Sequence, residues 1–314
     1  MCSKPQIAIL GVTGFIGRGL PAEFVGHGMT CTGISRSGGG DIPGVDRWQT
    51  PASLDFTGHH AVINLAGESI ARRWTASNRR LFHASRVGLT RRVVEAIVRL
   101  PAEARPKVLV NASAVGIYGD RGDEVLTEFS APGSGYLAEL CREWEAAAMA
   151  AEALCVRVVC LRTGVVLGRD GLAFRKLTLM FKVGLGGRLG SGRQWMPWIH
   201  LDDLHAAIVH AVLSNSLAGA VNCTAPAADR NRDFARKLAS ALHRPAILPV
   251  TEFALKLALG GFGDALLASQ HALPAVLEAD GFNFRFPALE SAFEELVGEM
   301  PAGGAHRRAV GGDA

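Results

Sequence analysis

The sequence has few aromatic residues, six scattered cysteines and no long uninterrupted hydrophobic run. Its most apolar stretch, residues 254–268, is interrupted by Lys256 and Asp264, which argues against a membrane span. The cysteines form no C-x-x-C pair, a pattern typical of free thiols in a reducing compartment. The first residues run directly into a strand pattern and leave no room for a signal peptide. We therefore expect a soluble, cytoplasmic protein without a membrane partner.

Several catalytic and binding signatures are also missing. No histidine or cysteine group has metal-ligand spacing, and no G-x-S-x-G turn of a hydrolase occurs, so we expect no metal site. The net charge is only +4, although residues 72–105 hold nine arginines and two acidic residues. No recognised nucleic-acid module or interleaved aromatic residues accompany these arginines, so we expect no nucleic-acid partner. They form either a solvated face or a group that neutralises a bound phosphate.

Short apolar runs alternate with helical patterns over the first half of the chain. Because such alternation is typical of a parallel sheet covered by helices, we predict an α/β fold, a Rossmann-type doubly wound parallel sheet with a smaller C-terminal substrate lobe. Pro21 is awkward inside the first helix. The predicted strands cover 6–10, 29–35, 60–65, 107–112 and 156–162, and the predicted helices cover 15–27, 75–100 and 135–154.

From about residue 168 the pattern changes to short glycine-rich segments and isolated helices, at 234–242 and at 252–267 with a break at Gly260-Gly261. We assign 1–168 to the nucleotide-binding domain, with parts of 200–225 completing its sheet. Residues 169–199 and 226–298 are assigned to the smaller lobe. The glycine-rich tail, 299–314, is predicted to be disordered.

A glycine-rich turn follows the first predicted strand. Gly11 permits the tight turn, Gly14 lets the backbone approach a pyrophosphate, and Gly17 lets the helix pack close to the strand. The free N–H groups of the helix then face the phosphates, so Thr13, Phe15 and Ile16 are candidate cofactor contacts as well. The position between a strand and a helix is the context in which such glycines indicate dinucleotide binding.

The second predicted strand ends in Ser35-Arg36. NAD-binding proteins place an acidic residue there, which bonds the ribose 2′-hydroxyl, whereas a cation suits the 2′-phosphate of NADP. We therefore expect NADP(H) as the cofactor, with Ser35 and Arg36 as contacts. The alternative is that Arg36 is a solvated loop residue.

These motifs resemble the extended short-chain dehydrogenase/reductase superfamily and its NAD-dependent epimerase/dehydratase group. The shared features are the glycine spacing, Asn64-Leu65-Ala66-Gly67 and the segment 113–119. The segments NLAGESI (64–70), RTGVVLG (162–168), 184–204 and FRFP (284–287) are similar to a subgroup whose bacterial members are often labelled cell-division-inhibitor homologues. The resemblance covers about residues 5–295.

The resemblance implies further site residues and a further domain. Leu65, Ala66 and Gly67 are expected on the adenosine-ribose side of the cofactor. Arg86 is expected to face the cofactor from the long helix, and Val166 to lie in the loop that covers the nicotinamide end. A short C-terminal domain of unknown function is implied at about residues 247–295.

The resemblance also implies a catalytic tyrosine, which stands at Tyr136. In the superfamily a lysine four residues later lowers the pKa of this tyrosine, but this chain has Leu140 there. The superfamily's substrate-holding hydroxyl aligns with Ala114, and Ser113 is its neighbour. We therefore expect Tyr136 and Ser113 as the catalytic residues of an incomplete triad.

Three interpretations of the incomplete triad stay open. Tyr136 acts as a proton donor, a role compatible with a high pKa; arginines near the nicotinamide replace the lysine electrostatically; or Tyr136 only packs. The leading hypothesis is an NADP(H)-dependent oxidoreductase or epimerase-like enzyme. The rival is an NADP(H)-sensing regulatory protein that binds a partner.

The segment 190–203 bears on the substrate. Nucleotide-sugar enzymes of the superfamily carry a diphosphate-binding arginine in this loop, and the aligned position here is Met196. We expect a small substrate that is not a nucleotide sugar. Trp195 and Trp198 form either an apolar wall of its pocket or core contacts between the lobes. We expect a monomer or a homodimer.

Overall fold

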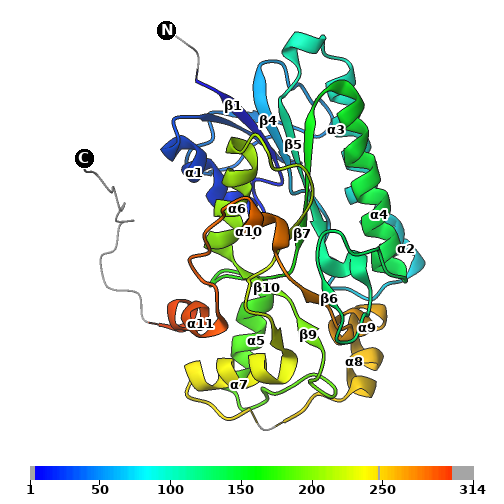
Figure 1. Ribbon diagram of the computed structural model, residues 1–314, viewed down its shortest axis with the longest axis vertical. Helices are drawn as coiled ribbons and strands as arrows, with labels where there is room; N and C mark the ends of the chain where they lie inside the picture. Colours follow the sequence, from blue (N-terminus) through cyan, green and yellow to red (C-terminus); the bar gives the residue numbers. More distant parts are fainter. Residues whose placement is uncertain (1–3, 247, 299–314) are drawn as a thin grey trace.

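A parallel sheet lies at the centre of the molecule (Figure 1). The computed structural model describes residues 4–246 and 248–298. Within these residues the main sheet has seven strands in the order β11-β7-β5-β4-β1-β2-β3, and every neighbouring pair is parallel. The order reverses at β1, as in a doubly wound Rossmann sheet, so the predicted fold class is confirmed. The strands are β1 (Gln6–Leu10), β2 (Thr30–Ile34), β3 (Arg47–Gln49), β4 (His59–Asn64), β5 (Val108–Ala114), β7 (Arg157–Thr163) and β11 (Gly219–Cys223).

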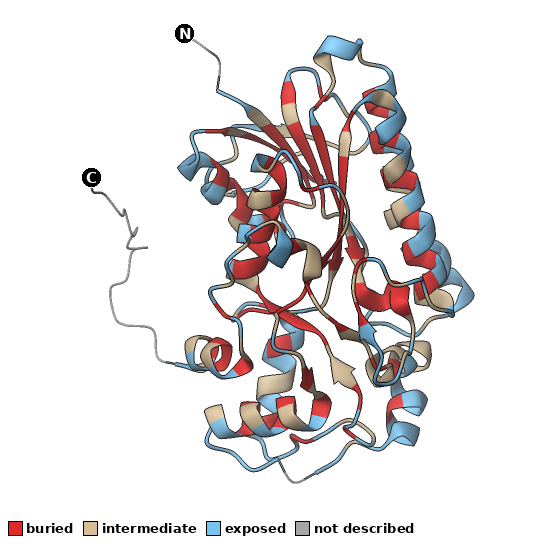
Figure 2. Ribbon diagram, viewed as in Figure 1, coloured by how far each residue is buried: buried red, intermediate tan, exposed pale blue. Residues whose placement is uncertain are grey.

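Helices cover both faces of this sheet (Figure 1). One face packs against α1 (Leu20–Gly26), α6 (Leu201–Leu213) and α10 (Ala275–Ala279). The other face packs against α3 (Leu89–Val98) and α4 (Tyr136–Met149), and α2 (Ala76–His83) precedes α3. The two apolar cores therefore lie on either side of the sheet, and Figure 2 shows them as buried segments through its centre.

The first helix differs from its prediction over 15–27. A 3₁₀ turn, Gly17–Gly19, precedes α1, and Pro21 lies in the first turn of that helix. Proline is tolerated there because the first helical N–H groups have no partner in the helix. The predicted helix 75–100 consists of α2, a π-helical turn (Ala84–Gly88) and α3, and Thr75 caps α2 by accepting from the N–H of Asn78.

The lower part of Figure 1 contains the remaining elements. Phe293 of α11 packs against Phe174 of α5 and Phe234 of α7. The short strand β13 pairs with β6, which joins the C-terminal segment to the nucleotide-binding half. The boundary at 168/169 stays a prediction. These elements are α5 (Leu172–Lys182), α7 (Asn231–Ala241), α8 (Glu252–Leu259), α9 (Gly261–Leu267), α11 (Leu289–Val297), β6 (Val125–Leu126), β8 (Val165–Leu167), β9 (Trp195–Met196), β10 (Trp198–His200), β12 (Asp229–Arg230) and β13 (His271–Ala272).

Over residues 4–246 and 248–298, no helix has both the length and the apolar character that a membrane span needs. The same residues contain no cluster of side chains suited to a metal ion. The predicted disorder of 299–314 lies outside the described residues.

Candidate functional site

The glycine turn lies where β1 ends at the carboxyl edge of the sheet. Gly11 has φ +79°, a conformation that favours glycine, and its N–H donates to Ile34 O at 3.2 Å. A Cβ on Gly17 would fall on the carbonyl oxygen of Gly11 and lie 2.8 Å from Cα of Val12. The backbone can therefore follow this path only with glycine at position 17. Thr13 and Gly14 are exposed, so the turn is open on its outer side.

The residues around this turn hold it in place. Phe15 lies against Gly168 and Gly171, where an added Cβ would approach its ring to 2.8 Å. The carbonyl of Ile16 contacts the His205 ring, with Nε2 2.7 Å from the oxygen. Burial lowers the pKa of His205, so the neutral ring is favoured and Nε2–H serves as the donor.

A buried polar network positions the loop after β4. The Asn64 side chain donates to Thr90 Oγ1 at 2.9 Å and to Asn111 Oδ1 at 2.8 Å. The Trp144 indole N–H donates to the same Thr90 oxygen at 3.0 Å. Leu65 N–H donates to Leu10 O at 3.0 Å, and so the predicted residues Leu65 and Ala66 lie beside Gly11, with Gly67 next in the chain.

Ser35 and Arg36 follow β2 at the same edge. Ser35 is buried, and its hydroxyl donates to Gly39 O at 3.1 Å, which shapes the loop after the strand. Arg36 is exposed and forms an ion pair with Glu68 at 2.8 Å. Glu68, just beyond Gly67, therefore lies in the predicted cofactor region, although the sequence reasoning did not single it out.

Arg86 extends from the π-helical turn toward Gly67. A Cβ on Gly67 would lie 3.2 Å from its guanidinium carbon, and this carbon is 5.3 Å from the Trp144 ring centroid. The Nη1 atom is buried and has no hydrogen-bond partner among the described residues. Burial lowers the pKa of Arg86. Arg86 thus presents an unsatisfied donor to the predicted cofactor loop.

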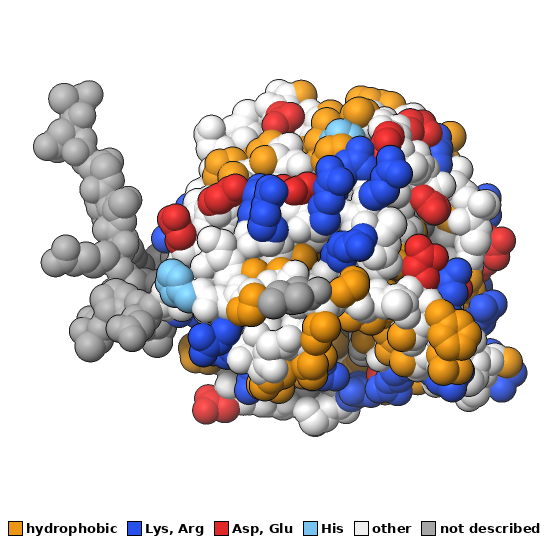
Figure 3. Space-filling view, turned by 90° about the horizontal axis from the view of Figure 1, so that it is seen from below, with side chains coloured by type: hydrophobic (Ala, Val, Ile, Leu, Met, Phe, Trp, Pro, Cys, Tyr) orange, Lys and Arg blue, Asp and Glu red, His pale blue; other side chains and the backbone are white. Residues whose placement is uncertain are grey.

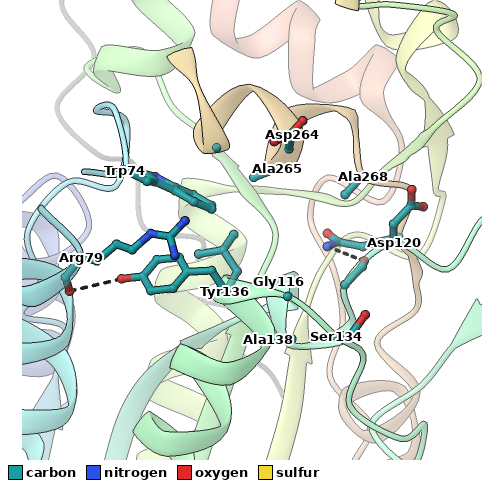
Figure 4. Close-up of a pocket in the computed structure, with 15 residues that line it drawn as sticks. Trp74, Arg79, Gly116, Asp120, Ser134, Tyr136, Ala138, Asp264, Ala265 and Ala268 are labelled. Atoms are coloured by element: carbon teal, nitrogen blue, oxygen red, sulfur yellow. Dashed lines mark hydrogen bonds between the residues drawn. The ribbon is translucent and has the colours of Figure 1, made fainter. Parts of the chain in front are cut away.

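Tyr136 begins α4 and lines a cavity of about 330 Å³ (Figure 4). Its hydroxyl donates to Arg79 O at 3.3 Å, and the Arg79 guanidinium carbon is 4.5 Å from the Tyr136 ring centroid. Trp74 packs beside the ring at a centroid distance of 5.1 Å. Burial raises the pKa of Tyr136, and the opposing charges of Arg79 and Arg86 do not reverse this.

Ser113 lies in a different, buried network and does not line the Tyr136 cavity. Its hydroxyl donates to Glu145 Oε1 at 2.6 Å, and Arg162 binds both oxygens of Glu145 at 2.9 Å. Arg162 also donates to Tyr118 Oη at 3.0 Å. Although burial opposes the charge, Glu145 holds the pKa of Arg162 above its ordinary value. The structure therefore does not bring Ser113 and Tyr136 together.

The position of the superfamily lysine is part of the core. Leu140 is buried and packs with Phe82 and Trp144. Burial raises the pKa of the neighbouring Cys141 thiol to about 12, so this cysteine is no nucleophile at neutral pH. Val166 lies in β8, opposite Ile199 of β10, and is not among the residues that line the Tyr136 cavity.

The expected apolar wall is not at this cavity. Trp198 is fully buried in the apolar core that also contains Phe293. The Trp195 ring stacks on the His271 ring with centroids 3.9 Å apart, and its indole N–H donates to Asp123 at 3.0 Å. Neither these residues nor Met196 line the Tyr136 cavity. The alternative interpretation, in which the tryptophans join parts of the fold, describes their contacts better.

Comparisons with known proteins agree with this architecture. Residues 7–223 match the NAD dependent epimerase/dehydratase family, and residues 250–296 match a domain of unknown function, DUF1731. A chloroplastic epimerase family protein of Arabidopsis thaliana, an SDR39U1 homolog, is 39% identical over 94% of this chain and 87% of its own length.

Two solved structures are also similar. Human epimerase family protein SDR39U1, crystallised with NADPH, superposes with a TM-score of 0.86 at 33% identity and covers 94% of this chain and all of its own. A nucleoside-diphosphate sugar epimerase from Corynebacterium glutamicum has a TM-score of 0.76 at 32% identity, over 94% of this chain and 59% of its own. This protein therefore belongs to the NAD dependent epimerase/dehydratase family.

Proposed function

We propose that the protein binds NADP(H) and acts as an oxidoreductase or epimerase-like enzyme on a small carbonyl compound, with Tyr136 as the proton donor. The observation that carries this proposal is the position of Tyr136, which lines a cavity and has a raised pKa. The NADPH bound in the human relative supports the choice of cofactor.

The residues at the carboxyl edge fit this cofactor. The turn of Gly11, Gly14 and Gly17 leaves room for a pyrophosphate, because Thr13 and Gly14 are exposed on its outer side and the following helical turn begins there. The buried Nη1 of Arg86 lacks an acceptor, which a cofactor oxygen would supply. Arg36 and Ser35 would hold the 2′-phosphate, with Leu65 and Ala66 against the adenosine ribose.

The chain's own contribution to the chemistry is proton transfer. When bound, NADPH supplies the hydride that reduces the carbonyl carbon of the substrate. Tyr136 gives its phenolic proton to the carbonyl oxygen, which becomes a hydroxyl, and the tyrosinate regains a proton from water. The raised pKa keeps Tyr136 protonated at neutral pH, so donation is favoured over abstraction. The long bond to Arg79 O is readily exchanged for a substrate oxygen.

The cavity size favours a small substrate. Its volume of about 330 Å³ is at the lower end of the range for small-molecule sites, roughly 300–1,000 Å³. Arg162 is a buried cation that precedes β8 in the sequence. Its guanidinium donates to Glu145 and to Tyr118, so it is not available to bind a diphosphate. These observations support a substrate other than a nucleotide sugar.

The test is NADPH oxidation with a panel of small carbonyl compounds, using wild type and Tyr136→Phe. We expect Tyr136→Phe to bind NADPH normally and to turn over about 100-fold or more slowly, the usual contribution of a positioned general acid. Equal turnover of the two proteins would remove Tyr136 from the mechanism.

A second candidate is an NADP(H)-sensing protein that binds a partner. It is favoured by the exposed apolar side chains of α5, where Leu172 is 67% and Leu179 is 59% exposed. Figure 3 views the end of the molecule where α7 and α8 lie and shows apolar side chains among basic ones. Tight NADPH binding without turnover of any compound would favour this candidate.

A further inference from the structure

The Tyr136 cavity contains a guanidinium group that has no anionic partner. Within the described residues, the Arg79 guanidinium takes part in no ion pair and no hydrogen bond. Figure 4 shows it beside the Tyr136 ring at the cavity, and its carbon lies 4.5 Å from that ring's centroid. By contrast, Arg36 and Arg72 each form an ion pair with the carboxylate of Glu68. The exposed Arg79 guanidinium thus contacts the Tyr136 ring and has no carboxylate partner among the described residues.

The acidic residues of the cavity do not balance this charge. An oxygen of Asp120 accepts hydrogen bonds from the N–H groups of Ser269 at 3.1 Å and Gly122 at 3.3 Å. Asp264 is paired with Lys256 at 3.4 Å. In Figure 4, Asp120 lies on the far side of the cavity from Arg79. Neither aspartate that lines the cavity is paired with Arg79, and Glu143, whose charge also acts on Tyr136, is paired with His83.

The N-terminus of α4 adds to the charge of Arg79. Residues 135–138 line the cavity, and Gly135, the N-cap residue, provides no side-chain hydrogen bond. The first intrahelical bond that uses the Gly135 carbonyl comes from the N–H of Glu139. The N–H groups before it have no partner within the helix and carry the positive end of its dipole. A ligand anion at this position would meet both these groups and Arg79.

We propose that the substrate is a short oxo acid whose carboxylate binds Arg79 while its carbonyl faces Tyr136. This inference rests on the proposed function, because it names the substrate class of the same site. The planar guanidinium can bind both carboxylate oxygens in parallel, an arrangement that lysine cannot reproduce. The contact of Arg79 with the Tyr136 ring keeps the guanidinium next to the phenol that would face the carbonyl.

The kinetic test compares short oxo acids with the corresponding oxo amides, which have the same shape but no charge, at saturating NADPH. The measured quantity is the ratio of kcat/KM for acid to kcat/KM for amide. We expect Arg79→Ala to lower this ratio about 10- to 100-fold, as expected for a lost charge-assisted hydrogen bond, and Arg79→Lys to restore only part of it. Arg80→Ala is the matched control, because Arg80 is adjacent and as exposed as Arg79 but does not line the cavity. Any general effect on Tyr136 changes both rates and cancels in the ratio.

A binding test separates this inference from the proposed function. The NADP⁺-loaded protein has no hydride to give, so oxo acid binding can be titrated calorimetrically without turnover. Binding that weakens in Arg79→Ala but not in Arg80→Ala supports the inference even if wild type reduces nothing, which would refute the proposed function alone. Turnover of amides as fast as acids, or oxo acid binding unchanged in Arg79→Ala, overturns the inference and leaves the proposed function standing. The absence of oxo acid binding also overturns it.

Discussion

Substitution of Gly17 by alanine tests the nucleotide cradle with a single methyl group. The added Cβ would collide with the Gly11 carbonyl oxygen and would lie 2.8 Å from Cα of Val12 and 2.9 Å from the carbonyl carbon of Gly11. All three atoms belong to the backbone of the turn, so no flexible side chain can move away. Overpacking of this kind costs about 1–3 kcal/mol of stability. The strain can be relieved only if the 3₁₀ turn moves away from the glycine turn.

Urea unfolding and NADPH fluorescence titration measure both consequences. We expect Gly17→Ala to lower the free energy of unfolding by about 1–3 kcal/mol and to weaken NADPH binding, because the N–H groups no longer converge on the pyrophosphate. The matched control is Gly26→Ala in α1, where nothing lies within 4 Å of the new Cβ. That change should stabilise the protein by up to about 1 kcal/mol and leave binding unchanged. Unchanged stability and affinity in Gly17→Ala would refute the steric reasoning.

Two further predictions concern buried charge. Glu145→Ala leaves the guanidinium of Arg162, whose side chain is only 8% exposed, without its carboxylate partner, so urea unfolding should show a free energy of unfolding lower by about 3–5 kcal/mol. Glu143→Ala is the control, because Glu143 is exposed and its loss should change the free energy of unfolding little. Equal losses in the two variants would contradict the prediction. Burial lowers the pKa of His205, so the unfolded chain binds a proton at higher pH than the folded protein does. The free energy of unfolding should therefore decrease as the pH falls below the ordinary histidine pKa of about 6.5, and His205→Gln should flatten this slope; an unchanged slope would argue against it.

Much of the fold could be predicted because its signals are local. The strand Gln6–Leu10 and the glycines after it are consecutive in the sequence, and this short apolar run before glycines indicates a buried strand followed by a turn. The prediction was less accurate at the first helix, where Pro21 shifts the helical start to Leu20. The edge strand Arg47–Gln49 was missed because it is short and only partly buried, so it leaves no apolar run.

The candidate site was harder to predict because its contacts are long-range. Glu145 and Arg162 are ordinary charged residues in the sequence, and only the packing of α4 against β7 makes them a buried pair that binds Ser113. The sequence also gave no sign that Arg79 would stack on Tyr136 from another helix. The basic run around Arg72–Arg105 was the available signal, but it could not show which arginine lacks a partner.

An NADP(H) site formed by the glycine turn and Arg36 is tested most directly by titrating NADPH and NADH into wild type and Arg36→Ala. Arg36 is exposed and pairs with Glu68, so its removal should leave the fold intact. If Arg36 holds the 2′-phosphate, wild type binds NADPH more tightly than NADH, and the variant loses about 10- to 100-fold in affinity for NADPH alone. Equal losses for both nucleotides, or no binding of either by wild type, would contradict it.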